Sequence, residues 1–81
     1  ISRKTTRQKI ASFLLSQAAK AGSSRFDIAL DRQALADYLC VNRSALSREL
    51  SALSDMGLLD YHRSSFVIRN TKGLQDLLES E

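Results

Sequence analysis

The chain has 81 residues, and a composition of 43% hydrophobic and 26% charged residues is typical of one small globular domain. Its apolar runs are only a few residues long, so no segment is expected to cross a membrane, and no signal peptide is visible. The single cysteine excludes an internal disulfide. One cysteine and one histidine also supply too few soft ligands for a metal site, which needs about three or four.

Charge is distributed unevenly along the chain. The net charge is +3, but residues 1–48 carry nine Lys or Arg against three acidic residues, a net of +6. Residues 49–81 carry three against six, a net of −3. A positive half of this kind favours a polyanionic partner, to which binding falls steeply with salt. Considered alone, the charge is equally consistent with a basic surface that serves only solubility.

Residues 5–21 are predicted to form the first helix. Its apolar residues recur at helical spacing: Ile10, Phe13, Leu14, Ala18 and Ala21. Thr5 or Thr6 can cap its start, and Gly22 is a natural end. Residues 25–30 then alternate between apolar and other side chains, which predicts a short strand with one face buried.

Two short helices joined by a tight turn are predicted next. Asp31 can cap the first, whose inner side is expected to hold Leu35, Tyr38 and Leu39. Ala36 is small where the two helices must cross closely. Asn42 can cap the second helix, which is predicted over about residues 43–56 and to end at Gly57.

The second helix of this pair has two contrasting sides. At about 100° per residue, one side is an apolar stripe of Leu46, Leu50 and Leu53. The other side carries two arginines among serines: Arg43, Ser44, Ser47, Arg48 and Ser51. Short serines let a helix backbone approach DNA closely, and guanidinium groups can bond guanine in the major groove. The pattern therefore predicts a helix that contacts DNA bases.

Residues 58–61 and 66–69 are predicted to be two strands connected through residues 62–65, and a short amphipathic helix follows Asn70 or Thr71. The aromatic side chains fall on positions expected to face the core rather than to stack on single-stranded nucleic acid: Phe13, Phe26, Tyr38, Tyr61 and Phe66. The element order predicts a mainly α fold with a small β-hairpin wing, which is a winged helix-turn-helix with a three-helix core.

Several stretches in a fixed order carry a resemblance to a known family. They are the opening helix RQKIASFLLSQA, the pairs Arg32-Gln33 and Leu35-Ala36, the block NRSALSR at 42–48, Leu50, Leu53, Gly57-Leu58 and Phe66-Val67-Ile68. Over nearly its whole length the chain resembles the C-terminal DNA-binding domain of bacterial transcription factors of the cyclic-AMP receptor protein and fumarate-nitrate regulator (CRP/FNR) family.

The resemblance implies sequence-specific binding of double-stranded DNA at inverted-repeat operators by a cytoplasmic, homodimeric bacterial regulator. RNA polymerase is a further candidate partner, and no membrane is involved. Residues 1–81 are expected to form a single domain, and the start at Ile1 rather than Met suggests a fragment of a longer regulator whose N-terminal sensor domain is absent. No cofactor is expected in this fragment, and the sequence does not identify the effector of the sensor.

The candidate site residues fall into two groups. Base contacts are expected from the second helix of the pair: Arg43, Ser44, Ser47 and Arg48, of which Arg48 matches the family's base-contacting arginine. Phosphate contacts are expected from Arg32, Gln33, Asn42, Ser51, Arg63 and Ser64. The alternative for the arginines is a surface pair with Glu49 or Asp55, and for the wing residues an ordinary polar turn. The basic residues Arg3, Lys4, Arg7 and Lys9 could add diffuse attraction or support the junction with a sensor.

Two positions depart from the family's pattern. The family often has glycine in the turn where this chain has Cys40, and a non-glycine residue in the left-handed conformation costs about 1–2 kcal/mol. Better-known members have glutamate where this chain has Ser44, so the preferred base at that position is expected to differ or to be less strict.

Two other classes of function were weighed. An enzyme has little support, because Cys40 and His62 have no catalytic context, and we expect Cys40 to be a packed residue of the turn. The alternative to DNA binding is a winged-helix protein–protein interaction module that does not bind DNA. Such a module would need an exposed apolar patch, for which the last helix with Leu74, Leu77 and Leu78 is the candidate.

Overall fold

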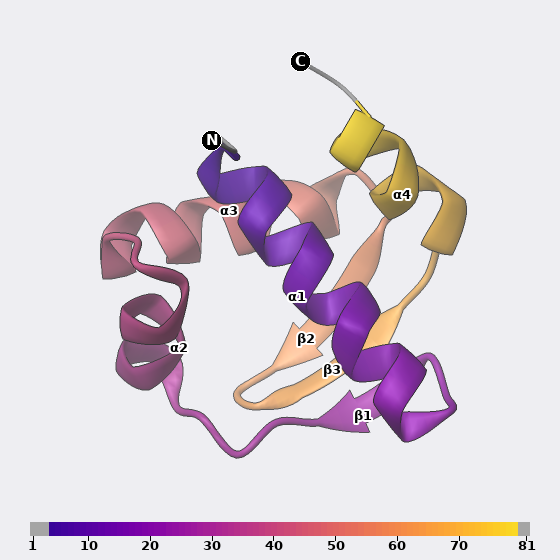
Figure 1. The fold of residues 1–81 in the computed structure, drawn as a ribbon, viewed down its shortest axis with the longest axis horizontal. Helices are drawn as coiled ribbons and strands as arrows, with labels where there is room; N and C mark the ends of the chain where they lie inside the picture. The colour runs from indigo at the N-terminus through magenta and orange to yellow at the C-terminus, as the bar shows by residue number, and fades with distance from the viewer. Residues whose placement is uncertain (1–3, 80–81) are drawn as a thin grey trace.

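Four helices and a three-stranded sheet make up the computed structural model, which describes residues 4–79 (Figure 1). In chain order the elements are α1 (Thr6–Ala21), β1 (Arg25–Asp27), α2 (Arg32–Leu39), α3 (Arg43–Asp55), β2 (Leu59–His62), β3 (Ser65–Ile68) and α4 (Thr71–Glu79). This order confirms the predicted winged helix-turn-helix, in which α2 and α3 are the helix pair and β2–β3 is the wing. Arg3, a predicted source of diffuse attraction, lies outside the described residues.

Each of the first three helices begins at the predicted cap. The Thr5 side chain accepts from the backbone N–H of Gln8, whose side chain accepts in return from Thr5, at 3.1 Å in both directions. Asp31 caps α2 by accepting from Ala34 at 2.8 Å. Gly22 ends α1 with a φ of 66°, the left-handed conformation that glycine adopts without strain.

The sheet has the strand order β1-β3-β2, and both pairings are antiparallel. The predicted hairpin is confirmed, but the pairing includes His62 opposite Ser65, so only Arg63 and Ser64 form the loop. Leu58, predicted to begin a strand, lies outside the ladder, and its carbonyl accepts from the backbone of residues 69 and 70. The predicted strand over 25–30 is shorter than expected, because the chain leaves the sheet after the N–H of Ile28 bonds to the carbonyl of Ser64.

The core lies between the three-helix unit and the sheet. Its fully buried large side chains come from every helix and from both hairpin strands: Ile10, Leu14, Leu35, Leu46, Leu50, Leu53, Leu59, Phe66 and Leu74. Ala36 is 0% exposed at the α2–α3 crossing, as its small size predicts. Among the described residues, no helix is long and apolar enough to cross a membrane.

The expectation that Tyr38 belongs to the core is wrong, because 66% of this residue is exposed. Leu35 and Ala36 provide the buried contacts of α2, and Tyr38 lies at the edge of that stripe. There its ring meets the half-buried ring of Phe13 edge-on, with the centroids 5.5 Å apart. Cys40, expected to be packed, is also exposed, because its backbone rather than its side chain makes the turn.

Candidate nucleic-acid interface

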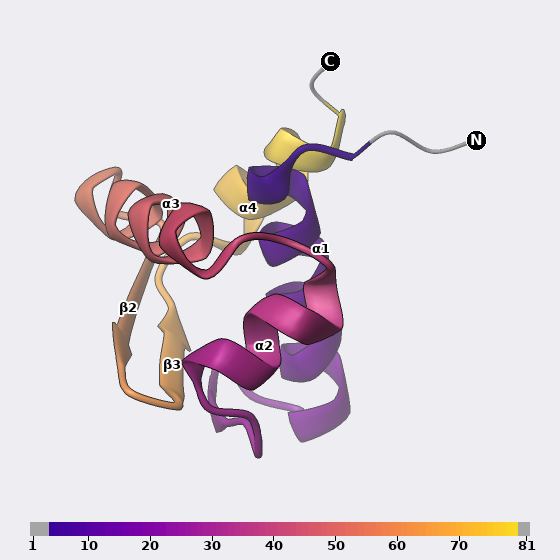
Figure 2. The ribbon, with the colours of Figure 1, turned by 90° about the vertical axis from the view of Figure 1, so that its left-hand side faces the viewer.

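The α3 helix is held by the three leucines of its apolar stripe. Leu46, Leu50 and Leu53 are each 0% exposed, and α3 packs against α1, α2 and β2. Complete burial of one such side chain contributes roughly 1.5–3 kcal/mol, so the stripe fixes the rotation of the helix. Figure 2 shows α3 and the β2–β3 hairpin on one side of the molecule and α1 on the other side. The outer side of α3 is not covered by the wing.

The exposed side of α3 is cationic and free of internal partners. The two arginines and three serines of the predicted face are all exposed: Arg43, Ser44, Ser47, Arg48 and Ser51. At about 100° per residue, Arg43 and Arg48 lie about 140° apart around the axis, and the serines occupy the arc between them. Within residues 4–79, neither guanidinium forms a hydrogen bond or an ion pair. The alternative of a surface pair with Glu49 or Asp55 is therefore not what the structure contains.

An ion pair between α1 and α3 accounts for the carboxylate that adjoins this face. Glu49 is half-buried and accepts from Arg7 of α1, with 2.6 Å between Nε and Oε1. The same Arg7 guanidinium reaches the sulfur of Met56 at 3.8 Å. No local sequence pattern indicates this pair, because the partners are 42 residues apart. Arg7 thus links α1 to α3 and neutralises an acid next to Arg48.

The turn before α3 is built by two residues with different roles. Asn42 caps the helix, because its Oδ1 accepts from the N–H of Ser44 at 2.8 Å and from that of Ala45 at 3.2 Å. Its amide NH₂ remains available to donate. Cys40 has the predicted left-handed conformation, with a φ of 58°, and its N–H bonds back to α2. The turn therefore forms without the glycine that the family often has there.

The start of α2 differs from a simple phosphate-binding helix terminus. The Asp31 carboxylate already accepts from Ala34, which places a negative charge where a phosphate would lie. Gln33 is exposed, but its amide donates to Asp37 at 3.0 Å. Arg32 is half-buried and turned toward the wing, where its Nη2 donates to the carbonyl of Arg63 at 2.8 Å.

Contacts from the helix pair hold the tip of the wing. The Arg32 guanidinium lies over the rings of Tyr61 and Phe66, 5.6 and 5.8 Å from their centroids. Arg63 is exposed and has a φ of 54°, a strained conformation for a residue with a side chain. The hydroxyl of Ser64 donates to the carbonyl of Leu30 at 2.9 Å, so a phosphate contact from it would require this bond to break. Arg63 is consequently the cation that the wing presents outward.

Two features considered for other classes of function are a metal site and an apolar patch on the last helix. In the described part of the chain, no group of three His, Cys, Asp or Glu side chains could hold a metal. The apolar patch proposed for a protein-interaction module is turned inward, because Leu74 is 0% exposed and Leu77 and Leu78 pack against the core. The α4 helix lies against α1.

Solved structures of longer regulators contain the same fold. FixK2 from Bradyrhizobium japonicum aligns with a TM-score of 0.85 at 31% identity, over 94% of this chain and 39% of that one. A protein from Eubacterium rectale described as a CRP/FNR-family transcriptional regulator aligns with a TM-score of 0.82 at 27% identity, over 95% and 35%. The CO-dependent transcription factor CooA from Carboxydothermus hydrogenoformans shares the fold at 19% identity, with a TM-score of 0.81 over 89% and 36%.

The chain therefore spans less than two fifths of each of these proteins. A search of the curated proteins found no match. The model of one family, the Crp-like helix-turn-helix domain, matches residues 8–77, which includes α2, α3 and the wing. Because that match takes in most of the 81 residues, the chain belongs to the family of Crp-like helix-turn-helix domains.

Proposed function

We propose that this domain binds double-stranded DNA sequence-specifically as the output domain of a bacterial CRP/FNR-type transcription regulator. In this proposal the N-terminal half of α3 enters the major groove. The observation that carries the proposal is the exposed face of α3, on which two arginines without internal partners flank an arc of serines. Family membership supports the same role.

The proposed contacts follow from which donors are unoccupied. Arg48 and Arg43 donate to base edges, bidentate to guanine where the geometry allows, and Ser44 and Ser47 donate to bases between them. Ser51, the amide NH₂ of Asn42 and the guanidinium of Arg63 donate to phosphates. Arg32, Gln33 and Ser64 are weaker candidates, since each already donates within the chain.

The proposal extends to the parent protein. We place this domain at the DNA-binding end of a longer regulator that acts as a homodimer on an inverted-repeat site. The matched proteins are about two and a half to three times as long as the aligned region, which leaves room for sensing and dimerisation elsewhere. One domain alone is expected to bind a half-site weakly, because avidity comes from the second copy.

A fluorescence-anisotropy titration tests the base contact. A duplex is first selected from a random pool with this domain, and the affinities of the selected and a random duplex are then measured at two salt concentrations. Arg48→Ala should weaken the selected duplex by about 1–3 kcal/mol more than the random one. Lys72→Ala, which removes one exposed charge from α4, is the matched control and should change both duplexes equally and slightly.

Salt dependence tests how many cations of the domain neutralise phosphates. Even if Arg43, Arg48 and Arg63 each neutralise one phosphate, log K should fall with log salt with a slope no steeper than about −2.7, or at most roughly 40-fold between 50 and 200 mM. Equal losses on both duplexes for Arg48→Ala would remove it from the base-contacting role. Salt-insensitive or undetectable binding at low ionic strength would reject DNA binding altogether.

A further inference from the structure

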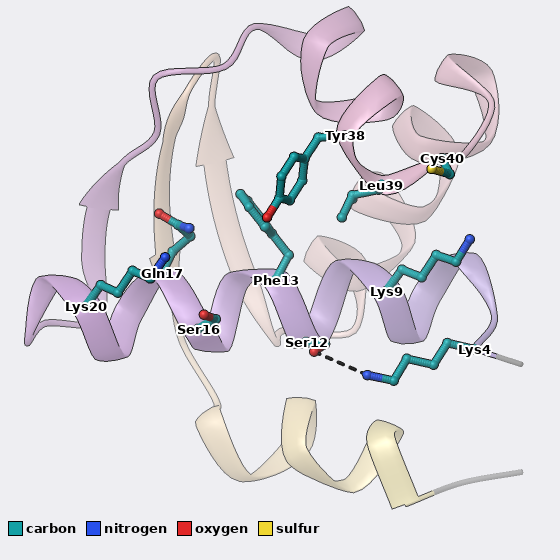
Figure 3. A pocket seen from close by; sticks show the side chains of 10 residues that line it. All are labelled: Lys4, Lys9, Ser12, Phe13, Ser16, Gln17, Lys20, Tyr38, Leu39 and Cys40. Carbon is teal, nitrogen blue, oxygen red and sulfur yellow. Dashed lines mark hydrogen bonds between the residues drawn. The ribbon is translucent and has the colours of Figure 1, made fainter. Parts of the chain in front are cut away.

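A groove between α1 and α2 lies on the side of the molecule away from the outer face of α3. Its volume is about 460 Å³. Figure 3 shows the side chains that line it, with Phe13 and Tyr38 directed toward one another at its centre. Lys20 lies toward one end of the groove, and Lys4 and Lys9 lie toward the other end. DNA binding by α3 makes no use of this surface.

The charged side chains that line the groove are all positive. Three lysines line it, and no acidic residue in the described part of the chain does. Lys9 and Lys20 form no ion pair or hydrogen bond through their ammonium groups within the described chain, and Lys4 has only a 3.5 Å contact with the hydroxyl of Ser12. Three lysines along one groove, with no acidic residue beside them in the described chain, favour an anionic partner.

The centre of the groove is apolar and aromatic. Tyr38 and Met56 are the two large hydrophobic residues that are exposed among residues 4–79, and Tyr38 belongs to this groove. Its ring rests edge-on against Phe13, with 5.5 Å between centroids and 61° between planes. Leu39 adds an apolar wall. Rigid aromatic rings that keep an apolar face in water are characteristic of protein-binding anchors.

We infer that this groove binds a short acidic peptide segment of another protein, with one apolar side chain between Phe13 and Tyr38 and carboxylates toward both ends. Lys9 and Lys20 are eleven residues apart on α1, so their positions are about 16 Å apart along the helix axis. A segment of that reach can place an anchor at the centre and an acid at each end. A polyanion such as DNA would satisfy the lysines but would leave the aromatic centre unused.

The test uses the 81-residue chain and a fluorescein-labelled 12-residue peptide that has Glu and Asp toward both ends and one Phe at the centre. Two matched peptides carry Gln and Asn in place of the acids, or Ser in place of the Phe. The acidic anchored peptide should bind at least tenfold more tightly than either matched peptide, and increasing salt should weaken its binding. Equal binding of all three would overturn the inference.

Variants then locate the site. Lys9→Glu with Lys20→Glu should weaken binding of the acidic peptide by about 4- to 25-fold, from about two- to fivefold for each exposed position. Tyr38→Ala removes the anchor wall at an exposed position and should weaken it at least fivefold. Lys72→Glu makes the same charge change on α4 and should leave the peptide affinity within twofold. No effect of the groove variants would overturn the inference.

Amide chemical shifts of the ¹⁵N-labelled chain give a readout that does not depend on any variant folding. Peptide addition should shift residues 9–20 and 38–40 while α3 and the wing remain unperturbed. Two other occupants would overturn the inference: duplex DNA, if it competes with the peptide and shifts the same amides, or a second copy of the chain, if these amides shift with protein concentration and the chain sediments as a dimer. Because α3 is separate from the groove, a failure to bind DNA would leave the peptide-binding inference intact, and a failure to bind the peptide would leave the DNA-binding proposal intact.

Discussion

Arg32 is predicted to hold the wing against the helix pair rather than to bind a phosphate. Its Nη2 donates to the carbonyl of Arg63 at 2.8 Å, and its guanidinium lies 5.6 Å from the centroid of Tyr61 and 5.8 Å from that of Phe66. These contacts join the first turn of α2 to the tip of the hairpin. Arg32→Ala removes both, while the carbonyl that it bonds returns to water.

The expected loss follows from the two interactions. A hydrogen bond from a charged group contributes about 1.5–3 kcal/mol, of which we take about 1 because this bond is exposed. A guanidinium over an aromatic ring adds about 0.5–1 kcal/mol at such a site. Arg32→Ala should therefore lower the free energy of unfolding by about 1.5–2 kcal/mol, or the Tm by about 6–16 °C for a domain of this size.

Urea unfolding followed by circular dichroism measures this loss, and two controls assign it. Arg32→Lys keeps the charge but loses the planar guanidinium, so it should recover little of the stability lost in Arg32→Ala. If Arg32 bound a phosphate instead, lysine would replace it with little loss of DNA affinity. Arg63→Ala keeps the carbonyl that Arg32 bonds and should change stability by less than about 0.5 kcal/mol. The reasoning is refuted if Arg32→Ala is as stable as the parent. If Arg32→Ala makes the salt slope of DNA binding shallower by about 0.9, Arg32 contacts a phosphate after all.

Two further changes test the turn and the α1–α3 ion pair. Cys40→Gly should raise the free energy of unfolding by about 0.5–1 kcal/mol, because the backbone strain relieved exceeds the conformational entropy that glycine loses on folding. Cys40→Val should instead lower the free energy of unfolding by about 1–2 kcal/mol. Equal urea midpoints for the two variants would contradict this expectation. Arg7→Met should free the Glu49 carboxylate beside Arg48 and weaken DNA binding about two- to fivefold, and adding Glu49→Gln should restore most of the affinity. A double variant that binds no better than Arg7→Met would exclude a charge effect.

Features encoded within a few neighbouring residues could be predicted from the sequence. The caps at Thr5, Asp31 and Asn42 depend on a side chain and an amide two or three residues away. The rotation of α3 depends on one apolar stripe, whose leucines repeat at helical spacing. The left-handed conformation of Cys40 is what the family resemblance implies, because the family often has glycine at that position. These local signals are sufficient to predict the fold class and the exposed face of α3.

Features that depend on distant partners could not be predicted. Nothing near Arg7 indicates that its partner is Glu49, and nothing near Arg32 indicates that it turns toward the wing instead of outward. The pairing of the predicted first strand depends on distant partners in the same way, because residues 25–27 pair with residues 65–67, about half the chain away. Tyr38 was misplaced since periodicity marks an apolar stripe but not which edge of it the neighbouring helix covers.

The same distinction changes what the positive charge of residues 1–48 means. Counting residues would give nine cations for DNA and a salt slope near −8. In the structure, most of those in the described part have other surroundings: Lys4, Lys9 and Lys20 line the α1–α2 groove, Arg7 pairs with Glu49, Arg32 contacts the wing and Arg25 lies on β1. Only Arg43 and Arg48 of that half remain on the exposed face of α3, and Arg63 joins them from the wing. A slope no steeper than about −2.7 would therefore indicate that the lysines of the groove do not contact DNA. A slope near −5.4, as expected for six cations, would mean that DNA also covers the lysine groove.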